Sequence, residues 1–280
     1  MKLTLAHSPD ADDAFMFYAL AEGLIETRGY EFEHILQDIQ TLNERALLGE
    51  LDITAVSIHA YAYLGERYAL LSSGASMGDN YGPMVVGQKR YGRDELKGVK
   101  IAVPGELTSA FLALQLYIGG RGGDAFDYAV VPFDEIFAYL RAGKAEAGLL
   151  IHEGQLTYGG EGLQLSVDLG KWWYEETGGL PLPLGGNAIR RDLGDDVIRE
   201  VSGILRESIR YGLEHRAEGL AHAKKLGRGL EGDDLGTFVG MYVNAMTLDY
   251  GERGRQAVRE FLSRGARAGL VPAVRHLEFV

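Results

Sequence analysis

The sequence of 280 residues contains no cysteine, and this absence excludes several kinds of site at once. Without a thiol the chain cannot form disulfides, zinc–thiolate sites or iron–sulfur clusters, and it cannot use a cysteine nucleophile. The chain has seven histidines, but no two of them show the H-E-x-x-H spacing of a zinc-binding helix. The G-x-x-x-x-G-K-[ST] phosphate loop is missing too. The sequence therefore shows no sign of a zinc–thiolate or H-E-x-x-H metal site and no sign of a nucleotide cofactor.

Positive charge is scarce as well. The chain carries 28 Lys and Arg against 40 Asp and Glu, which gives a formal net charge of −12. Nucleic acids and anionic membranes need a basic partner surface, so we expect neither as a partner. A small anion remains a possible ligand, because backbone N–H groups at the start of a helix can bind one whatever the net charge.

Long apolar runs are also absent. No segment approaches eighteen consecutive apolar residues, so no membrane-spanning helix is expected. The N-terminus has one lysine and a very short apolar run before Asp10, which is not the pattern of a secretory signal peptide. We therefore expect a cytoplasmic protein, and nothing in the sequence indicates its oligomeric state.

What the sequence does contain is a repeated order of elements. Strand, polar loop, helix, strand, helix, glycine and strand follow one another twice, with corresponding elements about 95 residues apart. Thr41 and Asp134 stand where they would cap the second helix of each copy, and Gly49 and Gly143 where they would end it. The predicted strands lie at 2–6, 30–38 and 51–57 in the first copy, and at 99–103, 126–133 and 146–152 in the second.

The alternation of strands and helices is typical of parallel sheets, so we expect an α/β fold with two lobes of one architecture. Extended stretches at 82–92 and 180–191 would carry the chain between the lobes and form a hinge. The amphipathic helices near the C-terminus would then pack on lobe one. We accordingly assign residues 1–87 and 187–280 to lobe one, and residues 88–186 to lobe two.

Polar loops follow the strands of both copies. Ligands of parallel sheets bind at the carboxyl ends of the strands, so these loops are the place to look for a site. The four loops are at 7–13, 57–61, 104–109 and 152–157. Two lobes whose loop edges face each other enclose a cleft, and we expect a small acidic molecule to bind in it.

Thr108 and Ser109 lie in the turn before the first helix of the second copy. Their hydroxyls, together with the free N–H groups of the helix start, can bind an anion. Simple N-capping accounts for the same residues, and a capping hydroxyl can do both.

The equivalent turn of the first copy is acidic, because it contains Ser8, Asp10, Asp12 and Asp13. Three carboxylates repel an anion, but they accept hydrogen bonds from the hydroxyl groups of a ligand. For Asp13, capping of the following helix is the alternative interpretation.

His152 follows an apolar strand at the predicted edge of the cleft. A histidine in this place is either a buried residue with satisfied hydrogen bonds or a general base, a role that suits imidazole near neutral pH. His59 sits near the matching place in the first copy, and Tyr61, Tyr63 and Tyr158 are further candidates for the lining of the cleft.

Five stretches of the chain resemble one enzyme family. They are HSPDADDAFMFYAL at 7–20, LDITAVSIHAYAYL at 51–64, VPGELTSAFLALQLY at 103–117, AGLLIHEGQLTY at 147–158 and GLPLPLGGNAIRRDL at 179–193. On these residues the chain resembles 1,4-dihydroxy-6-naphthoate synthase of the futalosine route to menaquinone. The I-H-E-x-x-x-T-Y run from Ile151 is the most specific piece. The resemblance implies the fold of type 2 periplasmic binding proteins.

The resemblance also implies an activity, the cleavage of cyclic dehypoxanthine futalosine to 1,4-dihydroxy-6-naphthoate and dihydroxyacetone. It implies that His152 is the base that starts this carbon–carbon cleavage. The substrate-binding residues would be Ser8, Ala55, Val56, Ser57, Thr108 and Ser109, with the last two at the substrate carboxylate. No metal and no organic cofactor is implied, and the expected partner is a small-molecule carboxylate.

The sequence departs from the family pattern at two places. Many relatives have S-P-C-P-N-D where this chain has S-P-D-A-D-D from Ser8, and many carry lysine where Ala55 stands. Chorismate dehydratase of the same pathway shares the fold and is the enzymatic alternative, although the I-H-E run favours the synthase. A non-catalytic binding protein for a small carboxylate is the alternative from another functional class.

Overall fold

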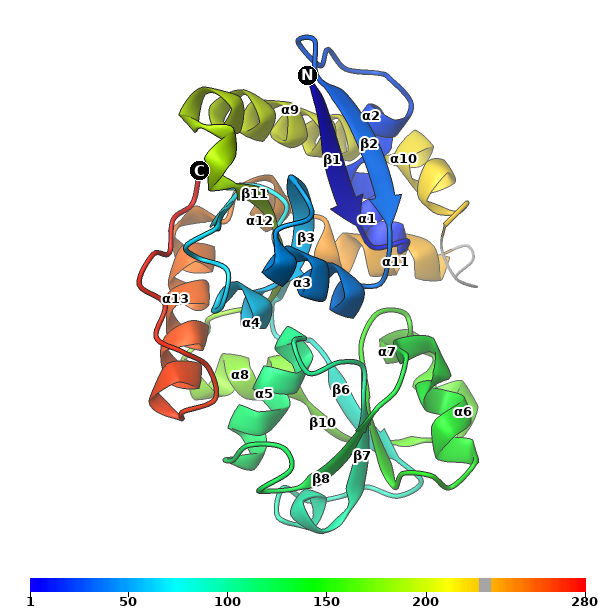
Figure 1. Cartoon of the computed structure of the whole chain (residues 1–280). Coiled ribbons are helices and arrows are strands. Elements are labelled where there is room, and N and C mark those ends of the chain that lie inside the picture. The colour runs from blue at the N-terminus through cyan, green and yellow to red at the C-terminus, as the bar shows by residue number, and fades with distance from the viewer. Residues whose placement is uncertain (227–232) are drawn as a thin grey trace.

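The computed structural model describes residues 1–226 and 233–280, and in this part of the chain the strands form two separate sheets. Each sheet and its helices make up one lobe, so the predicted two-lobed α/β architecture is confirmed (Figure 1). We call the lobe that contains both termini the first lobe and the other one the second lobe.

The first sheet has the strand order β2-β1-β3-β11-β4, and β5 pairs with β11 as well. β1 runs parallel to both of its neighbours, whereas β11 runs antiparallel to β3, β4 and β5. The strands are β1 (Lys2–His7), β2 (Glu31–Leu36), β3 (Ile53–Ser57), β4 (Tyr68–Leu70), β5 (Ser76–Gly78) and β11 (Leu182–Arg190).

The second sheet has the order β10-β6-β9-β7-β8. β7 runs parallel to β8 and β9, and β6 runs antiparallel to β9 and β10. The strands are β6 (Met84–Gly87), β7 (Lys100–Val103), β8 (Asp127–Val130), β9 (Ala147–Leu150) and β10 (Gln164–Asp168). Read in the reverse direction, β8-β7-β9-β6-β10, the second sheet matches the order β2-β1-β3-β11-β4 of the first strand for strand. This match confirms the predicted duplication and extends it to the antiparallel strands.

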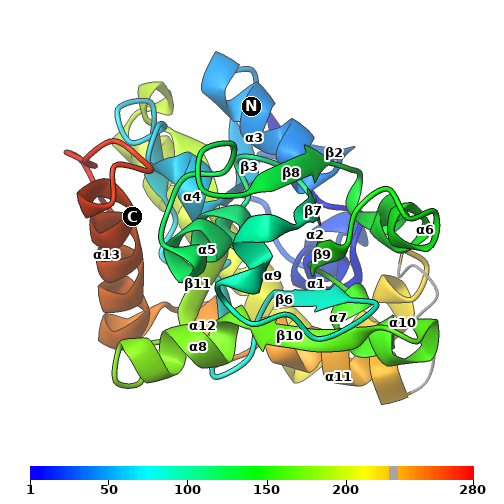
Figure 2. The same ribbon diagram turned by 90° about the horizontal axis from the view of Figure 1, so that it is seen from below.

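Helices connect the parallel strands and cover the sheets. In the second lobe α5 and α6 pack on opposite faces of the sheet (Figure 2). The helices of the two copies are α1 (Ala11–Met16), α2 (Tyr18–Ala21), α3 (Ile39–Leu48) and α4 (Ile58–Tyr61), then α5 (Ser109–Ile118), α6 (Ile136–Arg141), α7 (Gly154–Thr157) and α8 (Leu169–Glu176). Short 3-10 turns lie at Glu95–Gly98, Phe133–Glu135, Tyr158–Glu161 and Arg191–Leu193.

The C-terminal helices lie mainly on the first lobe, as predicted (Figure 1). The apolar face of α9 packs there against α1 and α2, and α13 extends along the side of the molecule as far as α5 of the second lobe. These helices are α9 (Asp195–Glu214), α10 (Arg216–Ala223), α11 (Asp233–Tyr242), α12 (Ala245–Leu248) and α13 (Gly251–Arg267). None of the helices in the described ranges is both long and apolar enough to cross a membrane.

The predicted helix ends are right, but the predicted helix caps are wrong. Gly49 and Gly143 follow α3 and α6 at φ values of 75° and 65°, a conformation that glycine adopts at little cost. The N-cap of α3 is Asp38, whose side chain accepts the N–H of Thr41 at 3.1 Å. The earlier cap gives the helix one more hydrogen-bonded turn than predicted. Asp134 lies inside the 3-10 turn that precedes α6.

The chain crosses between the lobes twice, at 79–83 and at 177–181, a few residues before the predicted places. The difference arises because β6 pairs within the second sheet and all of β11 within the first. A sequence shows that a segment is an apolar strand, but not which sheet it joins. The predicted boundaries of the two lobes, at residues 87 and 186, stay predictions. β6 ends at the first of these boundaries, and the second falls within β11.

An apolar cluster beside the crossings joins the two lobes. It contains Tyr61 and Phe261 of the first lobe together with Leu114 and Trp173 of the second. Trp173 is fully buried and donates its indole N–H to the carbonyl of Pro181 at 3.0 Å, so it packs in the core. The lobes are thus packed together on the hinge side, and their polar loops meet on the other.

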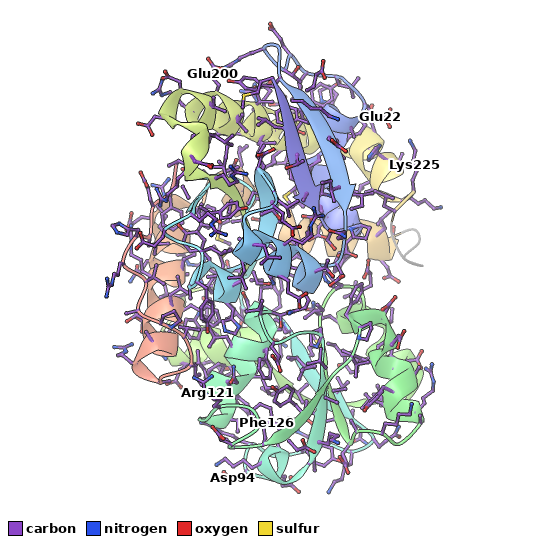
Figure 3. All side chains as sticks on the ribbon, viewed as in Figure 1. Glu22, Asp94, Arg121, Phe126, Glu200 and Lys225 are labelled. Carbon is purple, nitrogen blue, oxygen red and sulfur yellow. The ribbon has the colours of Figure 1, made fainter. Side chains whose placement is uncertain are left out.

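Charged side chains are confined mostly to the periphery (Figure 3). Glu22 and Lys225 meet at the edge of the first lobe, where the Lys225 ammonium lies 3.2 Å from the Glu22 carboxylate. Exposed pairs of this kind contribute about 0–1 kcal/mol each. The charges that matter for a function are therefore those few that are buried between the lobes.

Candidate active site

The loops at the strand ends enclose one cavity between the lobes. It contains about 750 Å³ of empty space, a volume that includes space open to solvent. All seven residues of the predicted site line this cavity, namely Ser8, Ala55, Val56, Ser57, Thr108, Ser109 and His152. The structure thus brings the predicted residues together, and the contacts that they make with a ligand stay predictions.

The acidic turn after β1 is held by its own hydrogen bonds. The Ser8 N–H donates to the Asp13 carboxylate at 2.7 Å, and the Ser8 hydroxyl donates to Asp10. Asp10 is the N-cap residue of α1, yet its side chain makes no capping hydrogen bond. Asp13 therefore fixes Ser8 and does not cap α1, which corrects the alternative interpretation.

The carboxyl groups of this turn are buried, and burial changes their protonation. Asp10 is fully buried, and Asp12 and Asp13 are each 8% exposed. Burial, reinforced by the neighbouring aspartates, holds the pKa of Asp12 well above its usual range. Burial also raises the pKa of Asp13 to about 7, although the Ser8 N–H opposes this shift. Near neutral pH the turn is thus less negative than its composition suggests.

His152 lies two residues beyond the end of β9, in a turn with a left-handed backbone at φ 53°. Its ring packs on Phe133, with 4.7 Å between ring centroids. Its Nδ1 lies 3.3 Å from an oxygen of Asp10 in the other lobe. Its Nε2 is buried and has no hydrogen-bond partner among the described residues. One ring nitrogen is therefore engaged, and the other is available to a ligand.

Thr108 is the N-cap of α5, so the capping interpretation of this residue is correct. Its hydroxyl accepts the N–H of Phe111 at 3.2 Å and donates to the carbonyl of Gly105 at 2.8 Å. The hydroxyl proton is therefore already used within the protein. An anion at this turn would instead be bound by the first N–H groups of α5, which have no carbonyl partner within the helix.

Ser109 ties the same turn to the first lobe. Its hydroxyl donates to the carbonyl of Leu184 at 2.5 Å and accepts the N–H of His59 at 3.1 Å. The His59 Nδ1 lies 3.1 Å from the carbonyl of Thr108, and burial lowers the pKa of His59 to about 4. A neutral His59 thus joins α4 to α5 behind the cavity.

His59 and the three tyrosines that we expected in the lining are not part of it. Tyr61 is fully buried and donates its hydroxyl to the carbonyl of Tyr68, whereas Tyr63 is 46% exposed. Tyr158 belongs to the 3-10 turn after α7. The single turn of α4 rotates the side chains that follow Ser57 away from the cleft, which an extended loop would not have done.

The sequence analysis did not single out several other residues in and around the cavity as candidates for the site. Asn43 is fully buried in α3 and holds Ser57 through two hydrogen bonds, of 2.8 Å to its N–H and 3.0 Å to its hydroxyl. The Tyr242 hydroxyl of the first lobe donates to Gln155 of the second at 2.8 Å. Gln155 lay within a predicted loop, but Asn43 and Tyr242 lie on helices whose patterns are those of ordinary amphipathic helices.

One string in the cavity wall matches a catalytic motif by sequence alone. Residues 74–78 read G-A-S-M-G, which has the spacing of a nucleophile elbow. An elbow needs a sharp turn from a strand into a helix, but Ser76–Gly78 is the strand β5, paired with β11. The geometry therefore does not make Ser76 an activated nucleophile. The described residues also contain no cluster of His, Asp and Glu that could hold a metal ion.

Comparison with known proteins identifies the family. Residues 3–267 match the family model described as menaquinone biosynthesis. The chain belongs to this family. It is 42% identical over 276 residues to 1,4-dihydroxy-6-naphthoate synthase of Thermus thermophilus, which covers 98% of each chain. It is 35% identical over 273 residues to the enzyme of the same name from Streptomyces coelicolor, over 97% of this chain and 95% of the other.

Solved structures confirm the fold of this family member. A protein of Archaeoglobus fulgidus has a TM-score of 0.90 at 44% identity, over 96% of this chain and 98% of its own. The alkanesulfonate-binding protein SsuA of Xanthomonas axonopodis has a TM-score of 0.71 at 14% identity, over 98% of this chain and 96% of its own. A Candida albicans protein with the generic periplasmic binding protein fold has a TM-score of 0.67 at 14% identity, over 100% and 98%. These last two likenesses show the fold alone.

Proposed function

We propose that the protein is a 1,4-dihydroxy-6-naphthoate synthase of the futalosine route, acting in the cytoplasm. In this function it is a carbon–carbon lyase that converts cyclic dehypoxanthine futalosine to 1,4-dihydroxy-6-naphthoate and dihydroxyacetone. Membership of the menaquinone-biosynthesis family and 42% identity with a synthase of this name support the proposal. The observation that carries it is the position of His152, which lines the cavity between the lobes with an available Nε2.

The two ends of the cavity suit the two ends of such a substrate. At one end the start of α5 offers N–H groups and the positive end of its dipole to a carboxylate. At the other end Asp12 and His152 face hydroxyl groups rather than an anion. Apolar side chains between them, Val56, Leu184 and Phe238, provide surfaces for a flat ring. We therefore orient the aromatic carboxylate toward Thr108 and the hydroxylated carbons toward His152.

His152 supplies the chemical step in this proposal. As a general base it takes up a proton from the bound substrate, and loss of that proton starts the carbon–carbon cleavage. The step is internal to the substrate, so it does not call for a redox partner. Exclusion of bulk water by the two lobes strengthens the hydrogen bonds on which such a proton transfer depends.

Turnover tests the proposal directly. Pure protein is mixed with cyclic dehypoxanthine futalosine and the naphthoate is measured by chromatography, with chorismate offered in parallel. His152→Asn is the matched variant, because asparagine tolerates the left-handed backbone of this position. We expect naphthoate from the wild type and a kcat reduced about 10²–10⁴-fold in the variant. No naphthoate from the wild type would contradict the activity, and full turnover by the variant would contradict only the role of His152.

A further inference from the structure

We propose that Asp10 is a positioning residue for His152, and that this pair forms only when the two lobes are closed on each other. The inference rests on the proposed role of His152 as the base and deepens it. Its structural basis is a close approach of the two side chains across the cleft, with 3.3 Å between Asp10 Oδ2 and His152 Nδ1. Asp10 belongs to the turn before α1 in the first lobe, and His152 to the turn after β9 in the second.

The Asp10 side chain is committed to this contact and not to its own helix. An aspartate at an N-cap ordinarily accepts a backbone N–H of the first helical turn. Asp10 occupies the N-cap of α1 with an extended backbone, and yet it makes no such bond. Its Oδ2 accepts the Ser8 hydroxyl and faces His152 instead. α1 therefore lacks a side-chain cap, because the side chain of Asp10 is directed across the cleft.

The carboxylate is also held rigidly. Asp10 is fully buried, and Ser8, which donates to it, is fixed in turn by the hydrogen bond from its own N–H to Asp13. A chain of contacts therefore runs from Asp13 through Ser8 and Asp10 to the imidazole. Such supporting hydrogen bonds keep a catalytic group in the required orientation without any adjustment during the reaction.

The pairing determines which nitrogen of His152 can act. In the proposed pair the Asp10 carboxylate accepts a hydrogen bond from Nδ1, so Nδ1 carries the proton of the neutral ring. The lone pair is then on Nε2, which is the nitrogen without a partner among the described residues. Asp10 therefore selects the tautomer that can take up a proton from a ligand in the cavity, and it stabilises the imidazolium that results.

Closure of the lobes and formation of the pair are coupled, because other contacts cross the cleft beside it. Gln40 of the first lobe accepts the N–H of Leu107 in the second at 3.0 Å. Tyr242 donates across the cleft to Gln155 at 2.8 Å. A hinge motion that opens the loop edge separates all of these groups together. The open form then lacks an oriented base, so proton abstraction waits for the substrate to be enclosed.

The first test reads the tautomer and does not depend on turnover. The full chain is labelled with 15N-histidine, and NMR in the presence of the product naphthoate reports which nitrogen of His152 carries the proton; His152→Asn assigns the signal. We expect Nδ1–H in the wild type, and a loss of this preference in Asp10→Asn and Asp10→Glu. A wild-type ring protonated at Nε2 and bare at Nδ1 would overturn the proposal.

The second test is kinetic. Asp10→Asn should lower kcat about 10–10³-fold while KM changes less than about threefold. In a His152→Asn background the same change should have no further effect, because the two residues act as one unit. Asp52→Asn is the control. Asp52 lies in the first lobe outside the cavity and accepts hydrogen bonds from Thr4, so its substitution should leave kcat unchanged.

The outcomes separate the two proposals. If Asp10→Asn and His152→Asn lower turnover independently of each other, or if Asp10→Asn changes KM alone, Asp10 acts on the substrate and not through His152. If Asp10→Asn does not fold, the tautomer of His152 measured by NMR in the wild type and in Asp10→Glu still decides whether Asp10 positions His152. A wild type without turnover contradicts the proposed function, whereas the NMR result continues to confirm or overturn the pairing by itself.

Discussion

The two lobes have equivalent sheets, but the turns at their cleft edges carry different chemistry. After β1 the turn holds three buried carboxyl groups and no basic side chain, whereas after β7 it holds the uncharged Thr108 and the start of α5. Both turns follow the first parallel strand of their copy and precede a helix. A duplicated scaffold can therefore present a hydroxyl-binding edge opposite an anion-binding edge, because only the turns need to differ.

The third strands show a second contrast. At the end of β3, Ser57 is held by Asn43 of its own lobe, so its position does not depend on closure. After β9, His152 contacts Asp10 of the opposite lobe. Ser57, the proposed binding residue, is thus fixed within its own lobe, whereas His152, the proposed base, depends on a contact with the other lobe. Each prediction below alters one side of these contrasts.

The largest effect is expected at the turn of the second lobe. Thr108→Val removes the side-chain cap of α5, because the Phe111 N–H and the Gly105 carbonyl both lose their hydrogen bond with the Thr108 hydroxyl. We expect KM for the carboxylate substrate to rise about tenfold or more, because the helix start loses its geometry, and stability to fall by about 1 kcal/mol. Steady-state kinetics and chemical denaturation measure the two effects.

Two matched variants qualify this result. Thr108→Ser keeps both hydrogen bonds and should restore most of the wild-type KM. Thr41→Val removes a hydroxyl near the start of α3, where it donates to Asp38 outside the cavity, and KM should stay unchanged. A wild-type KM in Thr108→Val would show that this turn does not bind the carboxylate.

An effect of opposite sign on stability, with no tenfold change in KM, is expected at the turn of the first lobe. The pKa of Asp13 is raised by burial to about 7, above its value near 4 in the unfolded chain, so the folded state is destabilised when this group ionises. Asp13→Asn should therefore stabilise the protein by about 1–2 kcal/mol at pH 8. The gain should shrink as the pH falls below 7 and be nearly lost at pH 4, where the carboxyl is protonated in the folded state and about half protonated in the unfolded chain.

Denaturation of both proteins at pH 8, 6 and 4 checks this prediction. Asparagine keeps an acceptor for the Ser8 N–H, so the variant changes the charge and preserves the hydrogen bond. Asp196→Asn at the exposed start of α9 is the control for net charge and should change stability by less than about 0.5 kcal/mol. An Asp13→Asn gain that is equal at pH 8 and pH 4 would mean that burial of the charge is not its cause.

The sequence was sufficient to predict the duplication and the cavity, because both depend on spacing. Strands, helices and the glycines after α3 and α6 recur in register, and the ends of parallel strands have to meet at one edge. The predicted site residues are therefore found in one cavity. Their identities as base and ligands were implied by resemblance and not by spacing.

Predictions failed where the local pattern allows more than one outcome, and where a contact between distant segments decides it. Thr41 has a good capping pattern, but Asp38 three residues earlier forms the cap. His59 matched the position of His152 by register, but the turn of α4 directs it toward Thr108. The pairing of Asp10 with His152 depends on how two lobes are placed, and no local pattern encodes that placement.

The smallest effect is expected at a contact between α3 of the first lobe and the turn after β7 in the second. Gln40→Ala removes the acceptor of the Leu107 N–H and so weakens the closed form by one hydrogen bond, about 0.5–1.5 kcal/mol. The product should then bind about 2–10-fold more weakly by calorimetry. Glu44→Ala is the matched control, because it removes the other partner of Gln40 and leaves the cross-lobe bond intact. Equal affinities in Gln40→Ala and Glu44→Ala would show that closure does not depend on this bond, and the coupling of closure to the base would then rest on Asp10 and Tyr242.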